Sequence, residues 1–233
     1  MGLESAAARG ELKEAPHDMR ITIAVGERNW AEQKRVSEEL QPVAVEWGIP
    51  PEIQRERGLA HGEMAYVLSK VDETNKESRS YGPCTGLAVV GQNKEGRPIS
   101  FLSHQTPHTI DAESRFSEQF THDLDEHLHA LKEACKEGTI DVVIVGGSTT
   151  EYRSLFGKKK ISDATYGRVA HSLTDTVRKI LMVEPRVFGP TVNSAESTGI
   201  TDVILDTQNR RLYIWRTQGQ AFGDFDKPAG EIL

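Results

Sequence analysis

The segment FSEQFTHDLDEHLHALKEACKEGTIDVVIVGG (residues 116–147) decides the fold class, because two different hydrophobic periods follow one another within it. Its first part carries apolar residues three or four positions apart, which predicts a long amphipathic helix that ends at Gly138. The apolar positions of that helix are Phe116, Phe120, Leu124, Leu128, Leu131 and Cys135. The β-branched run at residues 142–145 ends at Gly146 and Gly147, which is typical of a strand covered on both faces.

Shorter periodic segments on either side of this stretch predict further strands and helices. The expected strands are residues 19–25, 65–71, 86–90, 99–103, 186–188, 203–205 and 212–215, the last two joined as a hairpin across residues 207–209. A short helix is expected after Asn29, and a second amphipathic helix carries Val169, Leu173, Val177 and Ile180. The predicted class is therefore α+β, a layered domain with one continuous core.

The overall composition excludes several classes of protein. Hydrophobic residues make up 37% of the 233 residues, and 20 glycines bring the total near the globular average, so a wholly disordered chain is excluded. The net charge of -7 and the single basic run at residues 158–160 argue against a nucleic-acid partner. No apolar run approaches the ~20 residues that span a bilayer. Two cysteines and the lack of an apolar signal at residues 1–16 predict a cytoplasmic protein.

Cys84 and His104 are the candidate catalytic pair. Cys84 follows Tyr81-Gly82-Pro83 at the start of one predicted strand, and His104 lies at the far end of the next. Consecutive elements joined by a short turn usually pack together, so the thiol and the imidazole can meet. The imidazole would then remove the proton of a thiol that is mostly protonated at neutral pH. On spacing alone, the pattern favours a small buried cysteine and a loop histidine, because one Cys and one His in a chain are a weak signal.

Two other groups of residues have simpler structural interpretations. His122, Glu126 and His129 share a helix face opposite the leucine stripe, which indicates a solvated face and not a metal site. Gly146 and Gly147 lack the spacing of a phosphate-binding loop and are expected to form a structural turn. Cys135 is predicted to belong to the core, and neither a metal nor a cofactor is expected.

The order of motifs along the chain resembles that of the CheD family, the chemotaxis receptor glutamine deamidases. The matching motifs are His61-Gly62-Glu63, Ser78-Arg79-Ser80-Tyr81-Gly82-Pro83-Cys84, Phe101-Leu102-Ser103-His104 with Pro107, Val143-Ile144-Val145-Gly146-Gly147, Asn193 and Arg211-Leu212-Tyr213. CheD shares its fold with the catalytic domain of cytotoxic necrotizing factor toxins, and protein N-terminal asparagine amidohydrolase is a weaker look-alike. The resemblance implies a deamidase domain at residues 59–217, after an extension at residues 1–58 with a disordered start and a strand-helix unit, and before a tail at residues 218–233.

The resemblance also implies a fold, an activity and a set of site residues. The fold is a layered α/β/β/α sandwich, and the activity is cofactor-free deamidation of glutamine or asparagine in a target protein, at a side chain or at the terminus. Cys84 matches the nucleophile, His104 the base, and Ser78 stands where a threonine orients the histidine. The pocket-lining positions are Gly82, Thr85, Gly146, Gly147 and Asn193. A non-catalytic protein-binding module and a cysteine protease are the alternatives.

Three details of the site and its setting follow from this assignment. Pro83 has no N–H, so the oxyanion hole must use the amide of Cys84, that of Thr85, or a donor from another loop. The strand-helix unit at residues 19–57 is a hypothetical selector of the target. The location is the cytoplasm, or a host cytosol for a delivered effector, and the oligomeric state stays open.

Overall fold

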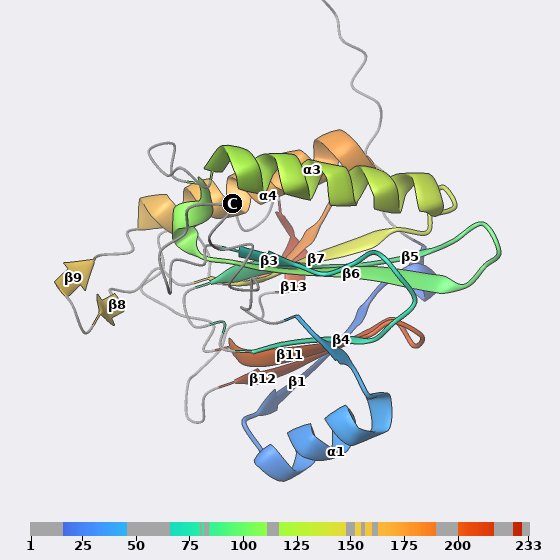
Figure 1. Cartoon of the computed structure of the whole chain (residues 1–233), viewed down its shortest axis with the longest axis horizontal. Coiled ribbons are helices and arrows are strands. Elements are labelled where there is room, and N and C mark those ends of the chain that lie inside the picture. Colours follow the sequence, from blue (N-terminus) through green and yellow to red (C-terminus); the bar gives the residue numbers. More distant parts are fainter. Residues whose placement is uncertain are drawn as a thin grey trace, which may run out of the picture.

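The computed structural model describes residues 16–45, 66–79, 81, 84–110, 117–147, 152–154, 157–159, 163–189, 200–216 and 226–229. Two sheets lie face to face, and helices cover the outer face of each (Figure 1). This arrangement confirms the α+β class. No helix in these ranges is both long enough and apolar enough to cross a membrane.

The larger sheet has six strands in the order β13-β10-β7-β5-β6-β3. Its strands are β3 (Tyr66–Leu68), β5 (Thr85–Gln92), β6 (Pro98–Gln105), β7 (Asp141–Gly146), β10 (Arg186–Phe188) and β13 (Asp226–Pro228). Strand β5 pairs antiparallel with both β6 and β7, while β10 runs parallel to β7. All six residues of β7 are buried, as predicted for a strand covered on both faces.

The smaller sheet has five strands in the order β1-β12-β11-β4-β2. Its strands are β1 (Thr22–Glu27), β2 (Val43–Ala44), β4 (Lys76–Arg79), β11 (Ile200–Asp206) and β12 (Arg211–Arg216). The predicted hairpin is confirmed, since β11 and β12 are antiparallel neighbours. The short elements η1 (His17–Met19), η2 (Pro107–Ile110), β8 (Tyr152–Ser154) and β9 (Gly157–Lys159) lie outside the two sheets.

Strand β4 was not expected, because its sequence Lys-Glu-Ser-Arg has no apolar alternation. Its inward polar groups find partners instead. Lys76 is almost fully buried, and its Nζ donates to Asp72 Oδ1, to the Thr74 carbonyl and to Ser100 Oγ, each at 2.9 Å. Ser100 belongs to the facing sheet, so this saturated ammonium joins the two sheets.

Within the part of the chain that the structure describes, three α-helices cover the sheets. Helices α3 (Ser117–Ala134) and α4 (Asp163–Leu181) pack on the six-stranded sheet, and α1 (Trp30–Leu40) packs on the five-stranded sheet (Figure 1). Asn29 caps α1 as predicted, since its Oδ1 accepts from the N–H groups of Ala31 and Glu32. Helix α3 ends at Ala134, before the predicted stop at Gly138, and Gly138 lies in the following turn with φ +74°, the left-handed conformation that favours glycine.

The prediction of one continuous core is wrong, because the six-stranded sheet is apolar on both faces and divides it. One cluster lies between that sheet and the helices α3 and α4, and it includes Cys135 as predicted. A second cluster fills the space between the two sheets and includes Cys84. Val36, Ile204 and Trp215 form a third cluster beneath α1. The sheets are thus held by separate apolar layers.

The strand-helix unit near the N-terminus is built into the body of the protein. Strand β1 pairs in parallel with β12. The N–H of Ile21 donates to Asp141 Oδ2 at 2.6 Å, and Arg186 Nη2 donates to both the Ile21 carbonyl and Asp141 Oδ2 at 2.7 Å. These buried bonds tie residues 16–45 to both sheets. The predicted boundary at residue 58 lies outside the described residues.

Candidate active site

Cys84 and His104 lie on neighbouring strands at one end of the six-stranded sheet. In this sheet Thr85 pairs with Gln105. Cys84 comes one residue before Thr85 in the chain, and His104 comes one residue before Gln105. In such a register they are diagonal neighbours, with Cα atoms about 7 Å apart. Cys84 packs in the cluster between the sheets, and His104 contacts Ser78 of the facing sheet, so both side chains enter the same layer.

Ser78 holds the imidazole from the opposite sheet. Its Oγ lies 3.0 Å from Nδ1 of His104 and 3.4 Å from the carbonyl oxygen of Val45. A hydroxyl that donates to the carbonyl keeps its lone pairs for an N–H at Nδ1. That tautomer places the remaining ring lone pair on Nε2, the arrangement that a general base needs. The structure therefore brings together the three residues predicted to be catalytic.

The ring of Tyr81 covers one face of the imidazole. The two rings are parallel within 2°, and their centroids are 4.1 Å apart. The Tyr81 hydroxyl donates to the carbonyl of Ser103 at 3.0 Å, which fixes the ring at its far end. Gly86 makes room for it, because a Cβ at that position would overlap the same hydroxyl and carbonyl. Sequence reasoning assigned Tyr81 only to a turn, because nothing local signals the stack.

Burial sets the charge state of the pair. The Cys84 side chain is buried, with 8% of the residue exposed, and desolvation raises the pKa of its thiol to about 12. His104 is fully buried, and desolvation lowers the pKa of its imidazole to about 3. At neutral pH the resting pair is a protonated thiol beside a neutral imidazole, with no preformed thiolate–imidazolium ion pair.

The backbone N–H and carbonyl of Cys84 both make hydrogen bonds within the protein. Its N–H donates to the Tyr81 carbonyl at 2.6 Å, and its carbonyl accepts from the N–H of Gly147 at 2.8 Å. Because its N–H already donates to Tyr81, the Cys84 amide is not free to act as an oxyanion donor. The remaining candidates are the amide of Thr85 and a donor from another loop. Gly146, the last residue of β7, and Gly147 have φ +89° and +95°, the left-handed region that favours glycine.

Of the predicted pocket-lining residues, the structure describes Thr85, Gly146 and Gly147. The Thr85 side chain faces the helices, where its Oγ1 accepts from Gln105 Nε2 at 3.1 Å. Ser103 Oγ in turn donates to Gln105 Oε1 at 2.9 Å, which completes a buried network on that face. Thr85 therefore adjoins the thiol through its backbone only. Gly82 and Asn193 lie outside the described residues.

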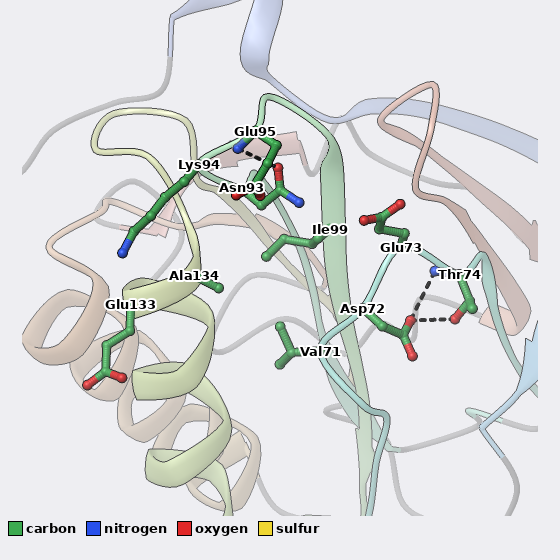
Figure 2. Close-up of a pocket in the computed structure, with 10 residues that line it drawn as sticks. All are labelled: Val71, Asp72, Glu73, Thr74, Asn93, Lys94, Glu95, Ile99, Glu133 and Ala134. Carbon is green, nitrogen blue, oxygen red and sulfur yellow. Dashed lines mark hydrogen bonds between the residues drawn. The ribbon is translucent and has the colours of Figure 1, made fainter.

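Two other features of the described chain lie apart from this site. On α3, ligand atoms of His122, Asp123 and Glu126 lie within 4.8 Å of one another, on an exposed face as the sequence predicted, with Asp123 in place of His129. A hollow of about 620 Å³ lies at the opposite end of the sheets, beside the β5–β6 turn (Figure 2). Two of its carboxylates, Asp72 and Glu73, already form ion pairs with Lys76 and Arg97.

No protein-family model and no curated protein sequence matches the chain. The resemblance to the CheD family therefore stays a prediction that rests on the ordered motifs.

Replacing Ser78 by alanine is expected to slow a reaction that uses His104 as its base about fivefold, because one hydrogen bond of roughly 1 kcal/mol that orients the base is lost. Ser78→Thr should retain the rate, since threonine keeps the hydroxyl. The check is the rate of ammonia release together with the tautomer of His104 from nitrogen chemical shifts. An alanine variant with unchanged rate and tautomer would show that Ser78 does not orient the imidazole.

Proposed function

We propose that this protein is a cysteine-dependent amidohydrolase of the CheD type that deamidates glutamine or asparagine in a target protein. The observation that supports it most is the hydrogen bond between Ser78 Oγ and Nδ1 of His104, made across two sheets beside Cys84. The resemblance implies this contact, although the two residues are 26 positions apart and on different sheets. The helix-sheet-sheet-helix order of layers also accords with a CheD-type α/β/β/α sandwich.

The proposed reaction uses the pair in two half-steps. Nε2 of His104 takes the proton of the Cys84 thiol as the sulfur attacks the carboxamide carbon. The tetrahedral intermediate then breaks its carbon–nitrogen bond, and the imidazolium gives its proton to the departing ammonia. Water, deprotonated by the same imidazole, attacks the thioester and releases a carboxylic acid and the regenerated thiol. The net change is one amide plus one water to one acid plus ammonia.

The resting charge state suits general base catalysis. A base must be neutral to accept a proton, and burial keeps the pKa of His104 far below neutral pH. Because burial also raises the pKa of Cys84, the proton moves during the attack and not before it.

A second candidate function is a protein-binding module without catalysis. The observation that favours it is burial, since a thiol with 8% exposure and a raised pKa is the usual state of a structural cysteine. A third possibility, a cysteine protease, uses the same pair on a peptide bond.

One experiment separates these functions. The purified protein is incubated with peptides that carry internal glutamine or asparagine, or either residue at the N-terminus, and ammonia and product masses are followed. Deamidation predicts ammonia and uncut peptides that carry an acid in place of an amide. Cut peptides would identify a protease, and unchanged peptides, together with an unreactive Cys84, would identify a binding module.

A further inference from the structure

We propose that Tyr81 is the positioning residue of this site, which holds the base and the backbone of the nucleophile in one fixed arrangement. This inference rests on the proposed function, because it assigns the geometry of the Cys84 and His104 pair to a third side chain. Three observations carry it: a ring stack, a backbone hydrogen bond, and a cradle of two glycines.

The stack fixes the plane of the imidazole. Parallel rings 4.1 Å apart leave His104 no space on the tyrosine side, so its ring can turn only away from Tyr81. The hydrogen bond between Ser78 Oγ and Nδ1 fixes the remaining rotation of the ring in its own plane. Together the two contacts aim Nε2 in one direction.

The backbone of the same residue anchors the nucleophile. The Tyr81 carbonyl accepts the N–H of Cys84 at 2.6 Å, which sets the direction in which the chain enters β5. A shift of Tyr81 therefore moves both partners of the pair. Ser78 contacts the imidazole and the Val45 carbonyl, whereas Tyr81 contacts both the imidazole and the backbone of Cys84, so Tyr81 has the wider control over the geometry.

Two glycines on neighbouring strands shape the space that the Tyr81 ring occupies. A Cβ on Gly86 would overlap the Tyr81 hydroxyl, and one on Gly146 would approach its Cδ1 to 3.3 Å. The phenol is tied to the Ser103 carbonyl, and burial raises its pKa above the ordinary value, so it stays protonated. Tyr81 thus acts through its ring and carbonyl, and its hydroxyl takes no part in proton transfer.

The test compares Tyr81→Leu, which removes the stack, with Tyr81→Phe, which keeps it. Tyr81→Leu should lower kcat for ammonia release about 100-fold with little change in KM, because small misplacements of reacting groups cost that much. The imidazole proton resonances of His104 should move out of the ring-current field of the tyrosine. Tyr81→Phe should keep both the resonances and most of kcat.

The resonance readout keeps this inference separate from the proposed function. If the wild-type protein releases no ammonia, the proposed function fails, yet the His104 resonances still decide whether Tyr81 holds the ring. Unchanged resonances and kcat in Tyr81→Leu would overturn the inference. A loss in Tyr81→Phe equal to that in Tyr81→Leu would also overturn it, since the hydroxyl would then be the acting group. Should Tyr81→Leu not fold, as shown by rapid alkylation of Cys135, the Phe variant alone decides.

Discussion

Replacement of Cys84 by alanine is expected to reduce ammonia release by at least about 1000-fold, because the reaction loses the atom that forms the thioester. Little residual activity is expected, since water would have to attack the carboxamide directly. The measurement is the initial rate on a peptide that the wild-type protein deamidates. A matched loss of alkylation at position 84, with an unchanged thermal transition, would assign the effect to chemistry and not to folding.

Cys135→Ala is the matched control for this loss. Cys135 is equally buried but lies in the other cluster, between the six-stranded sheet and the helices. Its removal should leave the rate close to that of the wild-type protein. A Cys84→Ala variant that keeps its activity, or a Cys135→Ala variant that loses it, would contradict the assignment of the nucleophile.

Gly146→Ala is expected to lower the free energy of unfolding by about 2–4 kcal/mol, the largest stability effect that we predict. Two costs combine at this position. The residue has φ +89°, and a Cβ there would overlap the Cys84 carbonyl oxygen and lie 3.3 Å from the ring of Tyr81. Denaturant unfolding measures the sum of these costs.

Gly138→Ala isolates the first of the two costs. Gly138 also has a positive φ, +74°, but no heavy atom lies within 4 Å of the added Cβ. We expect a loss of only about 1 kcal/mol there, which is the conformational cost alone. Equal losses in the two variants would show that close packing around Gly146 contributes nothing, and would remove the support it gives to Tyr81.

The elements predicted well are those whose local pattern has one interpretation. The leucine stripe of α3 and the buried run of β7 determine their own environment, because a period of 3.6 or a continuous apolar run fits one kind of packing. Strand β4 was not predicted, because its inward residues are polar. Lys76 and Ser78 are accommodated in part by Ser100 and His104 of the facing sheet, and a partner distant in the chain leaves no local signal.

Some features of the candidate site could likewise be predicted from the sequence, and others could not. Cys84, His104 and Ser78 could be named from the order of motifs, since each is a residue type with a role that the resemblance implies. The position of the Thr85 side chain on the helix face and the stack of Tyr81 on the imidazole depend on register and ring packing. A short motif predicts neither register nor ring packing, so these two features were found only in the structure.

The central claim is that His104 activates the Cys84 thiol, and the most direct test is the alkylation of the two cysteines in the native protein. Burial raises the pKa of Cys84 to about 12, and burial opposed by the charge of Arg210 raises that of Cys135 to about 11, so a protein without a working pair should alkylate Cys135 at least as fast. Our account predicts the opposite order with iodoacetamide at pH 7, with Cys84 faster by at least about tenfold.

Mass spectrometry of both sites over time gives the two rates, and His104→Gln supplies the control. In that variant the advantage of Cys84 should disappear while the rate at Cys135, which reports on folding, stays the same. A wild-type protein in which Cys135 reacts as fast as Cys84, or faster, would contradict the account.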